Sequence, residues 1–238
     1  MSGNTTSQHI SKQFDNELEH IRTRVLSMGG LVEQQLTNAL RALTEANIEL
    51  GQSVIDEEIK VNTLEVAIDE ECTRILARRQ PAAGDLRLLV AVAKTITDLE
   101  RVGDEAEKIA KMAIHLAGKQ GPRSYYIGIN AMGIHVRKML HGSLDAFARM
   151  DSKAAVEVAG KEPESDEQYV AILRQLITYM MEDPRSITSS LDAVWVARAM
   201  ERIGDHARNI CESVIYFVEG KDVRHISIEQ MEREVGAK

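Results

Sequence analysis

The sequence predicts an all-α protein made of two tandem, structurally similar three-helix bundles, and three observations lead to this fold. Only 4% of the 238 residues are aromatic and only 4 are proline, whereas helix-favouring Ala, Leu, Ile, Glu and Arg are abundant. Apolar residues recur at spacings of three and four, the period of one helix face. The same pattern restarts about 100 residues along the chain, which indicates an internal repeat.

The first repeat is expected to span residues 14–117 and to contain three helices. The first helix carries the apolar stripe of residues 21–43, and the second ends at Pro81 because proline cannot continue a helix. The third helix begins near Asp85. Two glycines and a proline in the segment GKQGPRS, residues 118–124, then mark the boundary between the repeats.

The second repeat is expected to span residues 125–220. Met28 corresponds to Met132 at an offset of 104 residues, and each lies in the apolar stripe of the first helix of its repeat. The fifth helix of the chain is predicted over residues 165–181 and stops near Pro184, which corresponds to the proline that ends the second helix. A sixth helix follows. Each repeat has enough residues for its own bundle core.

Composition limits the function. A formal net charge of -8 argues against a nucleic-acid-binding protein, since such proteins usually carry a basic face. The first dozen residues are polar and lack the apolar segment of a signal peptide, and no stretch approaches the roughly 20 apolar residues that span a bilayer. Cys72 and Cys211 are expected to be reduced thiols in the core. Residues 221–238 are expected to be a polar C-terminal tail that is frayed or forms a short extra helix. These features predict a cytoplasmic protein.

Two short motifs, ERVGD and ERIGD, combine acids with a glycine inside predicted helices. Glycine in a helix interior costs about 1 kcal/mol relative to alanine, so its presence in both copies needs a reason. Residues four apart share a helix face, so Glu100 and Asp104 form one pair of neighbouring carboxylates and Glu201 and Asp205 form another. One such pair taken alone is typical of a solvated face.

The repeat gives each half a further pair on its second helix. The offset of 104 carries Glu58 onto Glu162 and Asn62 onto Asp166. Like charges at this spacing destabilise a helix, and a bound cation would explain why they are kept. Four oxygen-bearing side chains between two helices suit a hard cation such as Mg²⁺, Mn²⁺, Ca²⁺ or iron. The candidate ligands are Glu58, Asn62, Glu100 and Asp104 in the first half and Glu162, Asp166, Glu201 and Asp205 in the second.

Gly103 and Gly204, which lie beside these acids, have two explanations. Either the missing side chain lets a metal ion or a neighbouring helix approach the carboxylates, or the glycines only permit tight helix packing. His206 follows Asp205 directly, but its counterpart in the first half is Glu105, so a symmetric role as a metal ligand fails.

The sequence offers little sign of catalysis. It contains no phosphate-binding loop, no dinucleotide fingerprint and, on these helices, no ferritin-like Glu-x-x-His pair. Neither cysteine has an evident base, so the protein is predicted not to be an enzyme. Arg78, Arg79 and Arg87 surround the turn RRQPAAGDLR. They bind a phosphate or an acidic partner surface, or they form a solvated basic turn, which is the simpler interpretation.

The segments LERVGDEAEKIA and MERIGDHARNIC, the turn RRQPAAGDLR and the opening MGGLVEQQL resemble the PhoU family of bacterial phosphate-signalling regulators. The resemblance covers residues 14–220. It implies two similar three-helix bundles with no established catalysis. It also implies an adaptor that restrains the phosphate-starvation response through a sensor histidine kinase and the ATPase subunit of the phosphate ABC transporter. Contact with the membrane would then occur only through these partners.

In some members of this family the acid-x-x-x-Asp motifs bind clusters of metal ions, so the resemblance implies Mg²⁺, Mn²⁺, iron or Zn²⁺ at the candidate ligands named above. Asn62 departs from the pattern because it is neutral where the second half has Asp166, and the first site is expected to bind metal more weakly. The sequence thus favours a negative regulator of phosphate uptake and signalling, expected to be a homodimer. The alternative is a metal-storage or metal-dependent hydrolytic helical protein.

Overall fold

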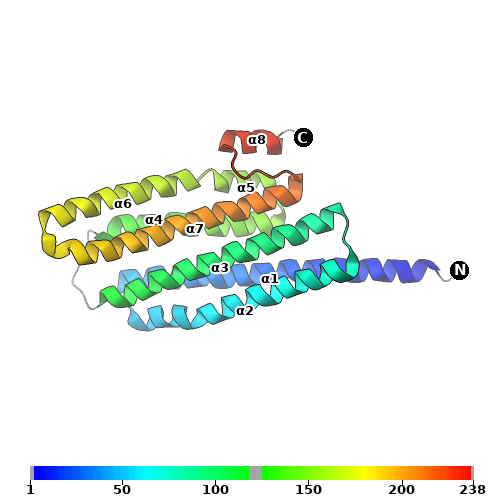
Figure 1. Cartoon of the computed structure of the whole chain (residues 1–238), viewed down its shortest axis with the longest axis horizontal. Helices are drawn as coiled ribbons and strands as arrows, with labels where there is room; N and C mark the ends of the chain where they lie inside the picture. The colour runs from blue at the N-terminus through cyan, green and yellow to red at the C-terminus, as the bar shows by residue number, and fades with distance from the viewer. Residues whose placement is uncertain (1–2, 118–124, 237–238) are drawn as a thin grey trace.

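A computed structural model describes residues 3–117 and 125–236, and these ranges contain helices and no strand (Figure 1). The all-α prediction is therefore confirmed. No helix in these ranges combines the length and the hydropathy that crossing a membrane requires. The helices of the first half are α1 (Gly3–Glu45), α2 (Ile48–Arg79) and α3 (Ala83–Ala117). The second half contains α4 (Tyr125–Arg149), α5 (Ser152–Ala159), α6 (Glu162–Glu182), the 3₁₀ turn η1 (Pro184–Ser186) and α7 (Ile187–Glu219), and α8 (Ile228–Gly236) follows.

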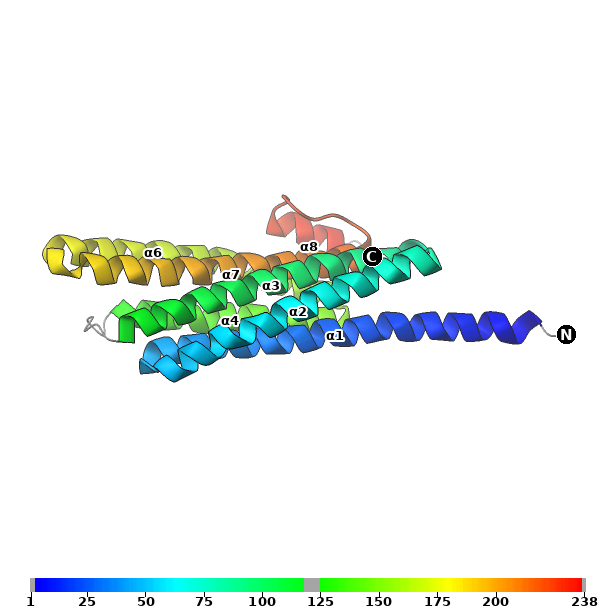
Figure 2. The same ribbon diagram turned by 60° about the horizontal axis from the view of Figure 1, so that its bottom comes forward.

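The two bundles lie side by side along the long axis of the molecule. Helix α3 packs against α7 at the centre and α1 packs against α4, while α2 and α6 lie on the outer sides of α3 and α7 (Figures 1 and 2). The first part of α1 projects beyond its neighbours (Figure 2). Helices α3 and α7 run antiparallel, so the third helices of the two repeats point in opposite directions where they pack together.

The apolar stripes form one core. Buried apolar side chains make a continuous cluster from Leu18 to Val235 that includes residues of both halves. The stripe predicted over residues 21–43 is buried as expected, with Ile21 and Leu36 fully inaccessible. The halves thus share packing across the α3–α7 and α1–α4 contacts, in addition to their own cores. The boundary predicted at residues 118–124 lies outside the described residues.

The second helix of the repeat is continuous in the first half and divided in the second. Asn47 caps α2 by accepting a hydrogen bond from the Leu50 amide, and Asp151, 104 residues later, caps α5 in the same way. In the second half Gly160 ends α5 and Pro163 lies in the first turn of α6, where its missing N–H costs nothing. The fifth helix predicted over 165–181 therefore begins earlier, at residue 162, and a short helix that the prediction missed precedes it.

Polar groups connect α3 and α7 across the middle of the molecule. Asn209 Nδ2 donates a hydrogen bond to Asp98 Oδ1 at 3.0 Å, and His206 Nδ1 lies 3.0 Å from the same oxygen. Further along the two helices, Arg202 Nε lies 3.3 Å from Glu105 Oε1. The Asp98 and Glu105 carboxylates are buried, so these contacts hold α3 and α7 at one register.

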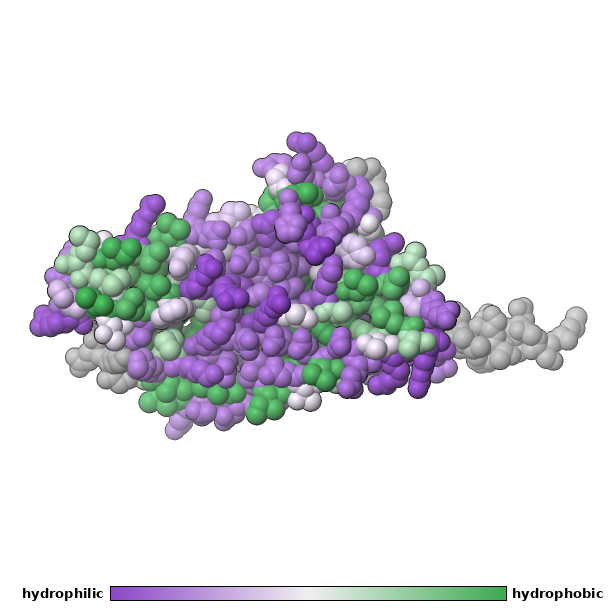
Figure 3. Space-filling model, in the orientation of Figure 1, coloured by the Kyte–Doolittle hydropathy of each residue, from purple (hydrophilic) through white to green (hydrophobic). Residues whose placement is uncertain are grey.

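The C-terminal segment is more structured than a polar tail. Val223, Met231 and Val235 are buried, and α8 packs against α5 and α7. Of the two outcomes expected for the residues after Gly220, a frayed tail and a short extra helix, the structure has the helix, which buries an apolar face. The face shown in Figure 3 is mostly hydrophilic, with hydrophobic patches at the left end, toward the right end and along the lower edge.

Candidate metal-binding site

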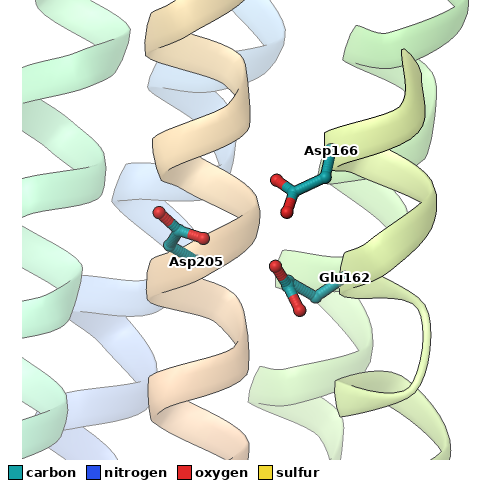
Figure 4. Close-up of side chains that lie close together, drawn as sticks. All are labelled: Glu162, Asp166 and Asp205. Carbon is teal, nitrogen blue, oxygen red and sulfur yellow. The ribbon is translucent and has the colours of Figure 1, made fainter. Parts of the chain in front are cut away.

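The acids of the second half come from two neighbouring helices. Glu162 is the first residue of α6, and Asp166 lies one turn later on the same face. Asp205 projects from α7 opposite them (Figure 4). Gly204 allows the two helices to approach this closely, because a Cβ at this position would lie 2.8 Å from the buried Ser165 hydroxyl. The glycine of ERIGD is thus explained by the contact with α6.

Three of the four predicted ligands of the second half converge. One carboxylate oxygen from each of Glu162, Asp166 and Asp205 lies within 4.8 Å of those from the other two. Glu162 is buried, Asp205 is half-buried and Asp166 is exposed, so the group opens to solvent on one side. Hard cations such as Mg²⁺ and Ca²⁺ take oxygen ligands and commonly keep water in their remaining positions. The donor set therefore fits the kind of ion that the sequence predicts.

The fourth predicted ligand, Glu201, has a different partner. Its Oε1 accepts a hydrogen bond from Arg198 Nη1 at 2.5 Å, and its Oε2 is buried with no hydrogen-bond partner among the described residues. Burial raises the pKa of Glu201, and the neighbouring Asp205 raises it further. The unpartnered oxygen is available to a cation, although Glu201 is not one of the three converging acids.

The acids of this group repel one another. Burial is the main cause that raises the pKa of Asp205, and Glu162 and then Asp166 add to it. A raised pKa means that the folded chain disfavours the anionic form of this carboxyl. A bound divalent cation would favour the anionic form instead, so proton binding and metal binding compete at Asp205.

An arginine already neutralises one of the converging acids. Arg208 Nη1 donates a hydrogen bond to Glu162 Oε2 at 2.7 Å, and Arg208 Nε contacts Glu212 at 3.2 Å. The first-half counterpart of Arg208, at the offset of 101 that relates the two third helices, is Glu107. The sequence prediction did not include Arg208 or Glu212. Aligning the two repeats would have shown that Arg208 stands where the first half has Glu107. The count of acids alone therefore overstates the negative charge of the second site.

The first half arranges its acids differently. Glu58 is buried, and its Oε2 accepts a hydrogen bond from Gln35 Nε2 at 3.1 Å. A Cβ on Gly103 would lie 2.9 Å from that same carboxylate, so this glycine makes room for Glu58 itself. Glu58 Oε1 and Gln35 Oε1 are buried without hydrogen-bond partners in the described part of the chain. Gln35, on α1, was not among the predicted residues, and no acid spacing marks it.

Glu58 is the acid of the first half whose pKa burial raises most clearly. Burial raises the pKa of Glu58 to about 7, with smaller contributions from Asp104, Glu107 and Glu100 and an opposing one from the Gln35 hydrogen bond. Burial and Asp104 also raise the pKa of Glu100. The first half nevertheless gathers no three acids within ligand distance among the described residues.

Asn62, the remaining predicted ligand of the first half, is exposed. With Asn62 in place of an acid, Glu58, Glu100 and Asp104 remain as separate carboxylates along the α2–α3 contact. The two halves thus differ in the arrangement of their acids as well as in their charge. Whether either group binds metal stays a prediction.

Other candidate residues have structural partners. Arg79 makes two hydrogen bonds with Glu17 of α1, at 2.7 and 3.0 Å, whereas Arg78 is exposed. His206 contacts Asp98 at the α3–α7 junction and is not one of the converging ligands. Cys72 and Cys211 are free and buried, as expected of core thiols. Burial raises the pKa of the Cys72 thiol to about 12, and it raises that of Cys211 as well. Arg87 lies against Gly220.

The sequence has close relatives over nearly its whole length. The PhoU domain model matches residues 25–113 and 129–214, one match in each half. A phosphate-specific transport system accessory protein PhoU homolog of Pseudomonas aeruginosa is 51% identical over 230 residues, which is 96% of this chain and 95% of the relative. The protein of that name from Escherichia coli is 47% identical over 232 residues, 98% of this chain and 96% of the relative.

Solved structures agree with the fold. The crystal structure of PhoU from Pseudomonas aeruginosa superposes with a TM-score of 0.85 at 50% sequence identity, covering 87% of this chain and all 100% of that one. The phosphate transport system regulatory protein PhoU from Streptococcus pneumoniae gives a TM-score of 0.82 at 30% identity, with 88% and 99% covered. The two tandem bundles are therefore the common architecture of these proteins.

Proposed function

The chain belongs to the PhoU family, and from this membership we propose that it is a negative regulator of phosphate uptake and of phosphate-starvation signalling. The observation that carries the proposal is a sequence identity of 51% and 47%, over nearly the full length, with proteins named as accessory to phosphate-specific transport. Both repeats lie within the matched length, and the alignments cover 95% and 96% of these two relatives. The resemblance of the ERVGD and ERIGD motifs, argued from the sequence, points the same way.

In this proposal the protein is a cytoplasmic adaptor. It contacts the ATPase subunit of the phosphate ABC transporter and the sensor histidine kinase of the phosphate response, and it acts as a homodimer. The elongated shape supports such a role, since two bundles side by side offer separate surfaces to two partners (Figure 1). Shared packing of α3 with α7 would keep those surfaces in a fixed relation.

The converging acids supply a metal-dependent part of the proposal. Glu162, Asp166 and Asp205 would hold a divalent cation, and Glu201 would contribute its unpartnered oxygen. Such an ion would supply positive charge between α6 and α7, which would favour the anionic form of Asp205 against the burial and the neighbouring acids that raise its pKa. Its proposed role is to hold these two helices together. Binding in the first half would be weaker, because Asn62 is neutral and exposed.

The same acids could also hold the metal ion of a hydrolytic enzyme. We propose that they do not have this role. Metal-assisted hydrolysis needs an open coordination position together with an acid or base directed at the substrate. Arg208, which contacts the converging acids through Glu162, is a permanent cation that is also engaged with Glu212 and cannot act as a base. Purified protein saturated with Mn²⁺ is therefore expected not to release phosphate from p-nitrophenyl phosphate. Turnover that disappears in Asp205→Asn would favour the hydrolytic alternative.

A gene deletion tests the regulatory proposal directly. Without this protein, transcription of the phosphate-uptake genes is expected to continue in phosphate-rich medium, and a plasmid copy of the wild-type gene is expected to restore repression. Unchanged repression in the deletion strain would count against the proposal. Co-purification of the tagged chain with the transporter ATPase and with the kinase tests the adaptor role, and sedimentation equilibrium tests the dimer.

A further inference from the structure

A groove of about 290 Å³ lies between α3 and α7, close to the only tryptophan of the chain. Tryptophan is a large side chain that is usually well buried, yet Trp195 is 66% exposed. It lines the groove and presents most of its surface to solvent. The lining comes from Glu105, Lys108, Lys111 and Met112 of α3 and from Trp195, Arg198, Ala199 and Arg202 of α7.

The groove is basic in an acidic protein. Its lining has four cations and one acid, whereas the whole chain has a net charge of -8. The Lys108 ammonium lies 3.0 Å and the Arg202 Nε 3.3 Å from the same oxygen of Glu105, whose side chain is only 5% exposed. Two cations that are each about half exposed thus share one carboxylate. Lys111 and Arg198 contact Glu107 and Glu201, so the four cations meet three acids and the groove keeps an excess of positive charge.

The internal repeat provides a comparison. An offset of 101 residues carries the lining of this groove onto a second cavity, of about 520 Å³, toward the other end of the α3–α7 pair. In that cavity Lys94 and Arg101 are balanced by Asp98 and Glu212. Asp222 and Arg224, from the chain that follows α7, also line it, and the Arg224 hydrogen bond is the main cause that lowers the pKa of Asp222, with a smaller contribution from Lys94. The equivalent cavity therefore already holds an ion pair from another chain segment.

The tryptophan groove lacks the acids that balance the cations of the other cavity. The counterparts of Asp98 and Glu212 are Ala199 and Lys111, so two acids of one cavity are replaced by a neutral residue and a cation in the other. The position of Lys94 is taken by Trp195, which exchanges a charge for an aromatic surface. Divergence between the halves has therefore produced a groove suited to an acidic and apolar ligand.

An apolar stripe leads to the groove along α7. Ile187, Leu191 and Trp195 follow one another at intervals of four residues and are 42%, 48% and 66% exposed. Ile177 and Met181 of α6, 45% and 80% exposed, lie on the adjoining helix. Hydrophobic side chains gather on the surface over this end of α6 and α7 (Figure 3). At a rise of 1.5 Å per residue the stripe is about 12 Å long, which matches roughly two turns of a partner helix.

We propose that the stripe and the groove together dock an amphipathic helix of a partner protein, with its apolar face on the stripe and its acidic residues against the four cations. Helices bind to grooves through apolar anchors three and four residues apart, and complementary charge sets their direction. An anionic bilayer is a poorer occupant, because a flat surface does not enter a groove that has a buried carboxylate at its base. The proposal rests on this surface alone and holds whichever cellular process the protein regulates.

Selection from a display library of random 16-residue peptides tests the proposal on the full-length chain. The enriched peptides are expected to combine apolar residues at helical spacing with several Asp or Glu residues. A selected peptide, synthesised with a fluorescent label, is expected to change the emission of Trp195 on binding and to bind more weakly as salt rises. Its affinity is expected to fall at least 10-fold in the double variant Lys111→Glu with Trp195→Glu, measured by anisotropy of the label.

The matched control is Ile59→Glu with Lys60→Glu, which makes the same chemical change at an exposed apolar residue and an exposed lysine of α2. Helical circular dichroism verifies that both variants fold. The proposal fails if no acidic, apolar peptides are enriched, or if the control weakens binding as much as the groove variant. It also fails if the groove variant abolishes binding to phosphatidylglycerol vesicles or self-association of the chain while peptide binding is unaffected, because the occupant would then be a membrane or a second copy.

Discussion

Replacing Glu58 by glutamine is expected to stabilise the folded chain above neutral pH and to have little effect near pH 4. The Glu58 carboxylate is buried, accepts one hydrogen bond, from Gln35, and lies near Asp104, Glu107 and Glu100. Glutamine has the same shape, and its amide oxygen can accept the same hydrogen bond. Its NH₂ group can also donate to Gln35 Oε1, which has no partner in the described structure.

The magnitude follows from the pKa. Burial raises the pKa of Glu58 from 4.5 to about 7, so the folded chain binds this proton more tightly than the unfolded chain. The resulting stabilisation is complete below about pH 4.5 and is lost as the pH rises through about 7. At 1.36 kcal/mol for each pKa unit, the loss is about 3 kcal/mol by pH 8. Glutamine does not titrate, so this loss disappears in the variant.

Urea denaturation followed by circular dichroism, at intervals from pH 4 to pH 8 and with a chelator present, measures this difference. The wild-type chain and Glu58→Gln should be similar at pH 4 and should diverge by about 2–3 kcal/mol at pH 8, with the variant more stable. Glu57→Gln is the control, since it removes the same charge one residue away, where the carboxylate is partly exposed and contacts Lys60. Parallel pH profiles for wild type and Glu58→Gln would refute the reasoning.

Further predictions concern the second half and the division of the chain. Calorimetry with Mn²⁺ on the chelated protein is expected to show tighter binding in the second half, a loss of at least about 10-fold for Asp205→Asn and a gain in the first half for Asn62→Asp; two equal sites would contradict the asymmetry. Arg208→Gln is expected to lower the Kd for Mn²⁺ by about 10-fold, because a cation then meets no competing guanidinium; an unchanged Kd would mean that the two do not compete. Gly204→Ala is expected to lower the free energy of unfolding by about 1–3 kcal/mol through overpacking against α6, and urea melts equal to wild type would disprove this. Residues 14–117 expressed alone are expected to be helical and to melt cooperatively, and a non-cooperative melt would show that the halves share one folding unit.

The helices were predictable from the sequence because their stability depends on a periodic apolar face. Ile21, Val25, Met28 and Val32 recur at helical spacing and are all fully buried. The division of the second helix in the second half was missed for a local reason. Attention to Pro163, two residues after Lys161, would have placed a helix start at Glu162, since proline is favoured in a first turn.

The candidate site was only partly predictable, for a different reason. Spacing shows which acids share a helix face, and so Glu162, Asp166 and Asp205 were found. It does not show which cation from another position reaches them, and Arg208 was overlooked. Gln35 comes from a helix with no acidic motif, so only the packing of α1 against the second and third helices reveals it.

The polar contacts between α3 and α7 determine how the two bundles respond to force. Asp98 holds both Asn209 and His206, and these bonds exist at a single register of the two helices. Sliding α7 along α3 by one turn, about 5.4 Å, would break them and leave a buried carboxylate without partners. The two bundles are therefore expected to move together. A partner that displaced the first bundle would then displace the second as well, so the stiffness of the α3–α7 contact would couple two binding events at opposite ends of the molecule.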